Sequence, residues 1–209
     1  MNDLKNKLLV LLLIISTNQI FGKSIDTSKL EEGDIIFHES KSEQATAIKL
    51  ATKSKYTHVG IIFKYGKTFK VLEAIEPVKI TDLPKFIGRG TNNHYVIKRI
   101  NNAKTKLTPE TIQKMKEFGD SLLGRHYDLY FEWSDDRIYC TELVWKLFAK
   151  FTGIKIGELR TLKEFDLTNK KVQSLLKKRY GKNIPYDEPV ISPVDMYQSK
   201  ELETVIEKN

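Results

Sequence analysis

The chain contains a single cysteine, Cys140, among its 209 residues. One thiol cannot form an intramolecular disulfide, and it cannot supply the several thiolates of a cysteine-rich zinc site. The fold must therefore be held by a hydrophobic core, and a hydrophobic fraction of 40% over this length is enough to build one. The length favours one domain, and 30% charged residues exclude a protein that crosses a membrane repeatedly.

Residues 1–22 have the organisation of a secretory signal peptide. Lys5 and Lys7 supply positive charge, and the eight residues from Leu8 to Ile15 are all apolar. This run is too short to span a bilayer as a helix. We therefore expect cleavage after Gly22, export to the periplasm or the extracellular space, and a single domain over residues 23–209. The alternative is a short amphipathic start of a cytoplasmic protein.

The charge balance is basic, with 35 Lys and Arg against 27 Asp and Glu and a formal net charge of +8. The positive residues are mostly lysine and are dispersed along the chain, and no zinc-finger spacing or RNA-recognition signature accompanies them. We therefore expect no nucleic-acid partner. A solvated basic surface is the simpler interpretation, and it would allow loose association with anionic lipid or cell wall.

Hydrophobic patterning predicts strands and helices that are grouped rather than strictly alternating, which favours an α+β fold. Strands are expected at residues 33–37, 56–64, 68–75 and 94–100. Helices are expected after Ser42, from Thr108-Pro109, from about Cys140 and after Thr168. Residues 80–90 are expected to be irregular, and three prolines predict an extended segment over residues 185–193.

Cys140 stands at the start of a predicted helix, because Leu143, Val144, Leu147 and Phe148 follow it at helical spacing. The first turn of a helix carries partial positive charge and free N–H groups, which lower a thiol pKa and favour the reactive thiolate. An unpaired cysteine in an exported chain is an intermolecular partner, a small core residue or a nucleophile. Position alone leaves the structural and the nucleophilic interpretation equally open.

A nucleophilic cysteine needs a base, and the base needs a group that orients it. His58 is the best placed of the four histidines, because it lies in a strand pattern on the face opposite Val59 and Ile61. Gly60, two residues later, would leave room beside the imidazole for a substrate or a helix end. A structural strand histidine is the alternative.

Glu73 lies among apolar residues of the next predicted strand, where an isolated carboxylate would be costly to bury. If Tyr65-Gly66 is a two-residue turn, Glu73 stands directly opposite His58, with Cβ atoms roughly 4.5–5.5 Å apart. Pairing would then remove the cost and fix the imidazole tautomer. A three-residue turn that includes Lys67 would place the two side chains on opposite faces. Glu73 would then be a surface residue of an edge strand.

Five short motifs occur in an order that resembles one known family. They are Gly33-Asp34-Ile35-Ile36-Phe37, residues 54–63 with their His-Val-Gly core, Leu72-Glu73-Ala74, residues 124–128 and Tyr139-Cys140-Thr141-Glu142-Leu143-Val144. Together with the later Ile191-Ser192-Pro193, they resemble the YiiX/YebB-type, circularly permuted papain-like enzymes of the NlpC superfamily. The resemblance spans residues 30–205.

The resemblance implies a permuted papain-like α+β fold, in which an antiparallel sheet packs against a helix that carries the nucleophilic cysteine. It implies that Cys140 is the nucleophile, His58 the base and Glu73 the orienting group. Tyr127 resembles a tyrosine that helps to stabilise the oxyanion in related enzymes, beside the backbone N–H of Cys140. A packed aromatic residue is the alternative for Tyr127. The family more often has serine than threonine at the position of Thr141. Both side chains can cap a helix, so this departure puts little in doubt about the resemblance.

The expected activity is hydrolysis of an amide or ester through a thioester acyl-enzyme, on peptide or lipid substrates of the cell envelope. The alternatives are an acyltransferase acting on lipids and a non-catalytic envelope-binding module on the same fold. Phe86, Ile87, Phe131 and Trp133 are candidates to line the site, or else ordinary core residues. No cofactor is expected, and a metal site on Cys140 is disfavoured because the histidines lack paired ligand spacing.

Overall fold

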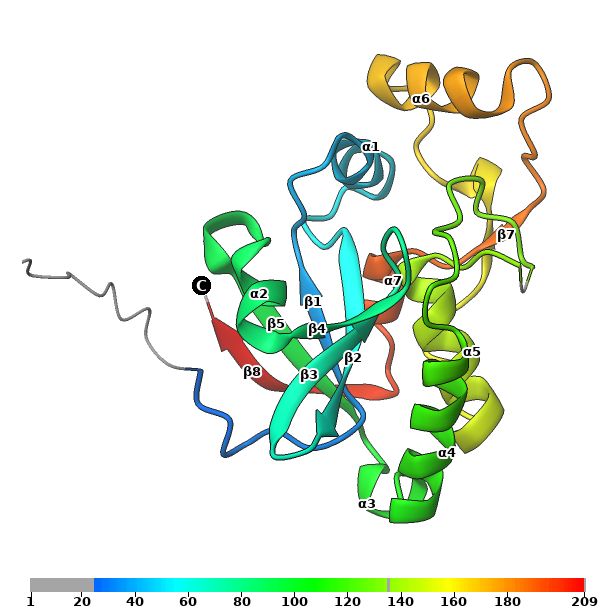
Figure 1. The fold of residues 1–209 in the computed structure, drawn as a ribbon. Coiled ribbons are helices and arrows are strands. Elements are labelled where there is room, and N and C mark those ends of the chain that lie inside the picture. Colours follow the sequence, from blue (N-terminus) through cyan, green and yellow to red (C-terminus); the bar gives the residue numbers. More distant parts are fainter. Residues whose placement is uncertain (1–24, 135, 209) are drawn as a thin grey trace, which may run out of the picture.

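The structure, a computed structural model, describes residues 25–134 and 136–208, so the expected signal peptide lies outside the described residues. Six strands form one antiparallel sheet in the order β4-β3-β2-β1-β5-β8 (Figure 1). They are β1 (Asp34–His38), β2 (His58–Tyr65), β3 (Thr68–Glu73), β4 (Lys79–Asp82), β5 (Tyr95–Ile100) and β8 (Leu202–Lys208). The two central strands, β2 and β1, are the ones that carry the candidate base and its neighbours.

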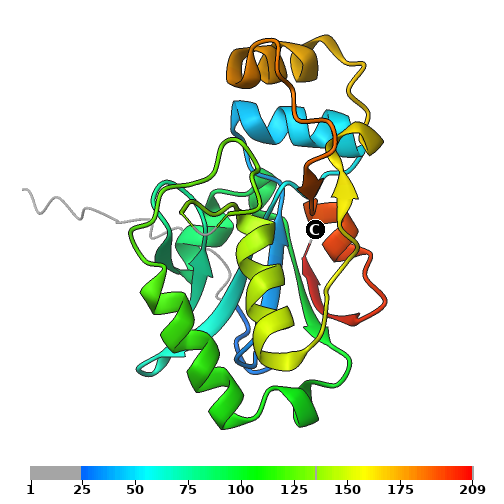
Figure 2. The ribbon, with the colours of Figure 1, turned by 90° about the vertical axis from the view of Figure 1, so that its right-hand side faces the viewer.

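The two faces of the sheet are covered by different helices. The helices α4 (Pro109–Ser121) and α5 (Cys140–Thr152) lie over one face, in front of the sheet in Figure 2. Helix α2 (Leu83–Gly88) covers the other face. Alternation along β2 explains this division, because Val59 and Ile61 belong to the core under α5, whereas Ile62 belongs to the core under α2.

A third group of elements forms a cap at one end of the sheet, with α6 beside α1 in Figure 1. Its apolar core is separate from the two cores of the sheet. The cap consists of α1 (Glu43–Thr52), the short strand β6 (Arg160–Thr161), the turn η2 (Leu162–Glu164), α6 (Lys170–Tyr180) and β7 (Pro189–Val190), which pairs with β6. The elements η1 (Thr91–Asn93), α3 (Ala103–Lys106) and α7 (Pro193–Tyr197) complete the fold.

Local sequence explains most element boundaries. Ser42 caps α1 by accepting a hydrogen bond from the backbone N–H of Ala45 at 3.0 Å, and Thr108 caps α4 in the same way through Thr111. Two expectations are wrong. Residues 80–90 hold the end of β4 and all of α2, and α6 is capped by Asn169, because the Thr168 side chain bonds Asp166 instead.

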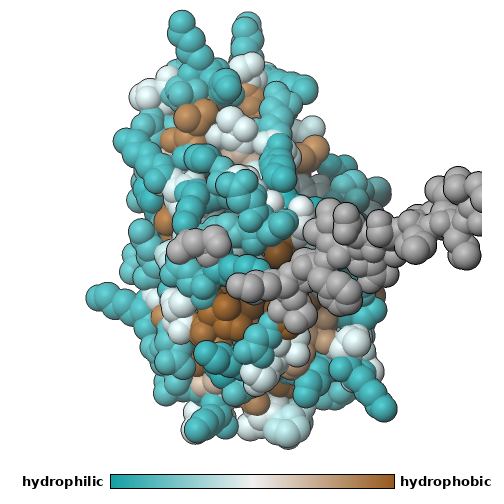
Figure 3. Space-filling model, turned by 90° about the vertical axis from the view of Figure 1, so that its left-hand side faces the viewer, coloured by the Kyte–Doolittle hydropathy of each residue, from teal (hydrophilic) through white to brown (hydrophobic). Residues whose placement is uncertain are grey.

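Most charged side chains lie on the surface. The face shown in Figure 3 is largely hydrophilic, with apolar side chains visible in separate patches. Within residues 25–134 and 136–208, no helix is both long and apolar enough to cross a bilayer.

Candidate active site

The hairpin of β2 and β3 differs from the expected register by two residues. Tyr65 pairs with Thr68, so the turn is Gly66-Lys67 rather than Tyr65-Gly66. The reason is conformational: Gly66 has a φ of 66°, which two-residue hairpin turns require and which glycine adopts without steric cost. A two-residue shift keeps every side chain on its face. His58 and Glu73 therefore share a face, as diagonal rather than directly opposed neighbours.

Gly60 allows two strands to pack closely and does not make room for a ligand. A Cβ atom at this position would lie 2.4 Å from Cγ1 of Val71 and 3.0 Å from the carbonyl oxygen of Leu72. The missing side chain thus lets β3 approach β2 closely. The expectation that Gly60 leaves space for a substrate or a helix end is wrong, because the neighbouring strand fills that space.

The carboxylate of Glu73 is fully buried at the end of β3 and is bound by three side chains. His58 Nε2 lies 2.6 Å from Oε2, the Thr81 hydroxyl donates to Oε1 at 2.5 Å, and Arg89 Nη2 donates to both oxygens at 2.5 and 2.6 Å. Burial raises the pKa of Glu73, but these partners outweigh it and bring the pKa to about 2. Glu73 is therefore ionised at neutral pH.

His58 is the first residue of β2, and its Nε2 is committed to Glu73, so only Nδ1 is left to face the thiol. Burial lowers the pKa of His58. Hydrogen bonds and charge from Cys140 and Glu73 raise it by more, so that the net pKa is about 9, above its ordinary value. The ring stacks on Phe86, with centroids 5.5 Å apart, and lies beside His38. Burial and the charge of His58 lower the pKa of His38 to about 2, so His38 is a neutral neighbour.

Cys140 is the first residue of α5 and is buried, with 3% of its surface exposed. Burial raises the pKa of its thiol, but hydrogen bonding and charge from His58, the backbone of Val59 and the Tyr127 hydroxyl lower it more. The net pKa of Cys140 lies below its ordinary value while that of His58 lies above its own. The two groups therefore favour the thiolate–imidazolium pair.

Tyr127 reaches the thiol from the loop between α4 and α5. A parallel bridge joins Tyr127 to Ile138, two residues before Cys140, and the backbone N–H of Tyr127 donates to Glu76 Oε2 at 2.9 Å. Burial and the neighbouring Cys140 raise the pKa of the Tyr127 hydroxyl well above its usual value, so it keeps its proton. A thiolate beside a hydroxyl donor and free N–H groups of a helix is chemically suited to attack a carbonyl.

An apolar cavity opens next to Cys140, between the cap and the start of α5. The empty space among its side chains, including its open end, is about 680 Å³. Its apolar lining comes from α1, η2, α6 and β7 of the cap and from the loop before α5, and includes Ile48, Phe131, Phe165, Val172, Leu175 and Val190.

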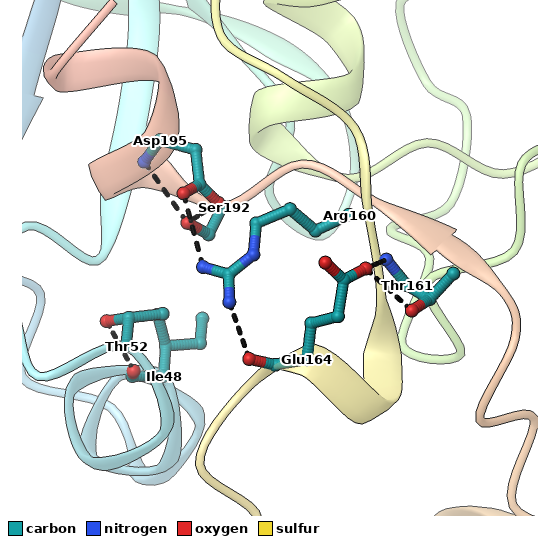
Figure 4. A network of polar contacts seen from close by, with 7 residues as sticks. All are labelled: Ile48, Thr52, Arg160, Thr161, Glu164, Ser192 and Asp195. Carbon is teal, nitrogen blue, oxygen red and sulfur yellow. Dashed lines mark hydrogen bonds and ion pairs between the residues drawn. The ribbon is translucent and has the colours of Figure 1, made fainter.

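One outer wall of this cavity is fastened by Arg160. In Figure 4 its guanidinium lies between Asp195 of α7 and the backbone carbonyl of Glu164, and it bonds both. The Thr161 hydroxyl and N–H bind the Glu164 carboxylate, which closes the turn that carries Leu162 into the cavity wall.

A second, more polar groove lies on the other side of Tyr127. It is lined by His58, Ser40, Thr57 and Glu76, among others. Gln44, Ile48 and Tyr127 line both spaces and so form the boundary between them.

The remaining sequence candidates divide clearly. Phe131 lines the cavity, whereas Trp133 packs against Tyr139 and Trp145 outside its lining. Phe86 and Ile87 belong to α2 and are buried in the core beneath it, and the Phe86 ring stacks on His58.

Four residues that contact the site were missed in the sequence: Thr81, Arg89, Gln44 and Arg179. Thr81 and Arg89 bind Glu73 from 8 and 16 residues away, and the pairs Arg179–Gln44 and Gln44–Tyr127 join residues 135 and 83 positions apart. None of them stands in a motif, so only the three-dimensional structure brings them to the site.

The chain matches known proteins over almost all of its length. Residues 29–206 match the model of a family described as permuted papain-like amidases of the YaeF/YiiX type, family C92. The chain is 42% identical to the uncharacterized protein YiiX of Escherichia coli K12 over 202 residues, which are 97% of this chain and 96% of that protein. A crystal structure of YiiX from Escherichia coli O157:H7 superposes with a TM-score of 0.81 at 44% identity, covering 86% of this chain and 98% of that one.

That crystal structure is described as one of a metalloprotein. In the described part of the present chain, no group of three or more His, Cys, Asp or Glu side chains is arranged to hold a metal ion. His126, for example, is exposed and pairs with Glu76 at 2.7 Å. The donor set of the described residues therefore does not fit a metal centre.

The antiparallel sheet, the helix headed by a buried cysteine and the order of the segments agree with the expected permuted papain-like α+β fold. The family match covers far more than half of the chain, and the relative is similar over its full length. The chain belongs to the permuted papain-like amidases of the YaeF/YiiX type and is a cysteine amidase or peptidase-type enzyme.

Proposed function

We propose that this enzyme cleaves an acyl–amide bond with Cys140 as nucleophile, His58 as general base and acid, and Glu73 as the group that orients His58. The observation that carries the proposal is the buried carboxylate at 2.6 Å from an imidazole whose other nitrogen is left for the thiol. Burying three ionisable groups together costs desolvation free energy unless opposite charges among them stabilise one another. Here each group shifts the pKa of its neighbour in the direction that nucleophilic catalysis needs.

The reaction begins from the thiolate–imidazolium pair. The Cys140 sulfur attacks the carbonyl carbon, and the C=O π bond becomes an oxyanion that accepts hydrogen bonds from the Tyr127 hydroxyl and the Cys140 N–H. The C–N bond then breaks as His58 gives its proton to the leaving nitrogen, and a thioester remains. His58 next takes a proton from water, the hydroxyl attacks the thioester, and the acid leaves as the thiolate returns.

The two spaces beside Cys140 give the substrate a direction. His58 must reach the leaving nitrogen, and His58 lines the polar groove, so the leaving amine lies in that groove. The acyl side then lies in the apolar cavity. The lining of that cavity favours a hydrocarbon acyl chain over a polar peptide, and an amide-linked lipid of the cell envelope is the substrate class that we propose. An ester with the same acyl group would follow the same route.

The proposed place of action is the cell envelope, after export directed by residues 1–22. Removal of residues 1–22, which hold two Lys and one Asp, lowers the formal net charge from +8 to +7, and this positive charge supports loose attraction to anionic envelope surfaces. Fractionation of cells that express the full chain, followed by the mass of the mature protein, tests this directly. A mature protein that still contains residues 1–22 in the cytoplasm would contradict it.

A series of acyl p-nitroanilides of increasing chain length tests the activity. The wild type should release nitroaniline and should prefer longer acyl chains, whereas Cys140→Ala should lose turnover and keep its fold. In Cys140→Ser the smaller, less nucleophilic oxygen should leave a trace of activity at most. Mass spectrometry after rapid quenching should find the acyl group on Cys140. A Cys140→Ala variant with wild-type rates would contradict the assignment of Cys140 as nucleophile. Transfer of the acyl group to an added amine would identify the enzyme as a transferase.

A further inference from the structure

The Tyr127 hydroxyl is connected to a cation on the cap through one side chain. Gln44, in the first turn of α1, donates from Nε2 to the Tyr127 hydroxyl oxygen at 2.9 Å. Its Oε1 accepts a hydrogen bond from Nη2 of Arg179, in the last turn of α6, also at 2.9 Å. Three segments that are far apart in sequence thus meet at the boundary between the apolar cavity and the polar groove.

The orientation of this chain of hydrogen bonds follows from the chemistry of its ends. A guanidinium group only donates, so the amide oxygen of Gln44 must face Arg179 and the NH₂ group must face Tyr127. The Tyr127 oxygen then accepts from Gln44, and its own proton is free to point elsewhere. Besides Gln44, the group that hydrogen-bonds this hydroxyl is the Cys140 thiol, while Arg179 acts on it only through its charge.

Arg179 is well suited to fix the amide. It stacks over Phe131, with its central carbon 5.3 Å from the ring centroid, and it forms no ion pair with a carboxylate of the described residues. Asp128 and Glu43 act on it only as more distant charges. The Gln44 oxygen is therefore the acceptor that the structure gives to this cation.

We propose that Gln44, held by Arg179, is a positioning residue that directs the Tyr127 proton toward the reacting centre. This inference rests on the proposed role of Tyr127 at the oxyanion and adds two residues from the cap to the catalytic apparatus. The thiolate receives the proton as a hydrogen bond in the resting enzyme, and the substrate oxyanion receives it after attack. No proton is transferred, because the hydroxyl only donates a hydrogen bond.

The variant Gln44→Glu tests the direction of the proton. A carboxylate has nearly the same shape as the amide and forms an ion pair with Arg179, so the fold should be kept. It can only accept hydrogen bonds, so it should draw the Tyr127 proton away from Cys140. We expect kcat on the best acyl p-nitroanilide to fall about 10²-fold or more, with KM changed by less than about threefold. Gln173→Glu, an added charge on the exposed face of α6, is the matched control and should behave as wild type.

A second measurement needs no substrate. The rate of alkylation of Cys140 by iodoacetamide, followed against pH by intact mass, reports where the thiolate forms. Gln44→Glu should move this profile to higher pH by about one pH unit, because the thiolate loses a hydrogen-bond donor. In a Tyr127→Phe background the same substitution should move it by less than half as much, since only the added charge still acts. Arg179→Met, which frees the amide to rotate, should lower kcat about tenfold.

The outcomes separate this inference from the proposed function. Gln44→Glu could keep the wild-type kcat and alkylation profile while Tyr127→Phe lowers kcat and moves the alkylation profile to higher pH. This result would overturn the inference and leave the enzyme assignment standing. An equal shift of the alkylation profile by Gln44→Glu in the wild-type and Tyr127→Phe backgrounds would also overturn it. Turnover by Cys140→Ala would overturn the proposed function itself.

Discussion

Glu73 and Asp34 are two fully buried carboxylates of the same sheet, and each is bound by an arginine. Arg89 donates to both oxygens of Glu73 at 2.5 and 2.6 Å, and Arg99 donates to both oxygens of Asp34 at 2.6 and 2.9 Å. Both carboxylates belong to motifs that support the family resemblance. By burial and by arginine pairing alone, the two regions cannot be told apart.

The remaining partner separates the two regions. Asp34 accepts its other hydrogen bond from the backbone N–H of Glu31 at 2.9 Å, which fastens the segment that enters β1. Glu73 instead holds the imidazole of His58. Burial raises the pKa of Asp34 in spite of Arg99, whereas the partners of Glu73 overcome burial and hold its pKa at about 2. The third partner, rather than the carboxylate–arginine pair, is therefore what distinguishes the proposed catalytic carboxylate from the other one.

The largest expected effect is the loss of activity in Glu73→Gln. The amide keeps the shape of the carboxylate but cannot support an imidazolium, so the proposed ion pair with Cys140 weakens. We expect kcat/KM on an acyl p-nitroanilide to fall by about 10³-fold, in line with other triads that lose the orienting charge. Asp34→Asn should stay within about twofold of wild type, because a core substitution away from the reacting groups acts on stability rather than on transition-state binding. Equal losses in both variants would remove the distinction between the two carboxylates.

The second effect is on stability, where Asp34→Asn should also show a loss. Asp34→Asn leaves the largely buried Arg99 with only Glu31 as an ionic partner, at 2.7 Å on the surface. Asparagine offers one acceptor oxygen in place of two, and the raised pKa of Asp34 shows that the folded protein tolerates a neutral group there, so the free energy of unfolding should fall by only about 1.5 kcal/mol. Chemical denaturation with urea measures this, with an unchanged m-value as the sign that the unfolded state is unaffected. A loss no larger than that of an exposed substitution such as Lys114→Gln would show that Asp34 has no structural role.

The comparison also explains what the sequence could and could not predict. Strand alternation placed His58 and Glu73 on one face, and helix periodicity placed Cys140 at the start of α5. Parity along a strand survives an error of two residues in the turn, which is why the wrong turn still predicted the right face. The distance between the two groups was not predictable, because it depends on the register set by Gly66.

The arginine and the hydroxyl that complete the Glu73 site were beyond sequence reasoning. Arg89 follows α2. The pattern of residues 80–90 did not predict this helix, because the proline and the glycine of that segment are typical of a loop. Thr81 is one polar residue in a short strand. Neither position carries a periodic or motif signal, and tertiary packing alone brings them to the carboxylate.

The third prediction uses pH to compare the two carboxylates. Glu73 has a folded pKa of about 2, below its ordinary value of 4.5, so it stabilises the fold above pH 4.5 and this stabilisation is lost as the pH falls toward 2. Asp34 has a raised folded pKa, so acid does not remove stability through this group. Urea unfolding measured from about pH 2 to about pH 6 should give a shallower acid decline for Glu73→Gln than for wild type, and no such flattening for Asp34→Asn. Parallel curves for all three proteins would contradict the opposite pKa shifts.

The smallest expected effect is that of Thr81→Val. The hydroxyl donates to Glu73 Oε1 at 2.5 Å, and valine fills the same volume without a donor. Since Arg89 still binds both oxygens, Glu73 stays ionised and His58 stays oriented, but the carboxylate loses one hydrogen bond. We expect a loss of about 1 kcal/mol in stability and a drop in kcat/KM of no more than about tenfold. Thr204→Val, at an exposed strand position of β8, is the matched control. If Thr81→Val were as inactive as Glu73→Gln, the hydroxyl rather than the arginine would be the group that holds Glu73 in place, and the pairing with Arg89 would be as purely structural as that of Asp34 with Arg99.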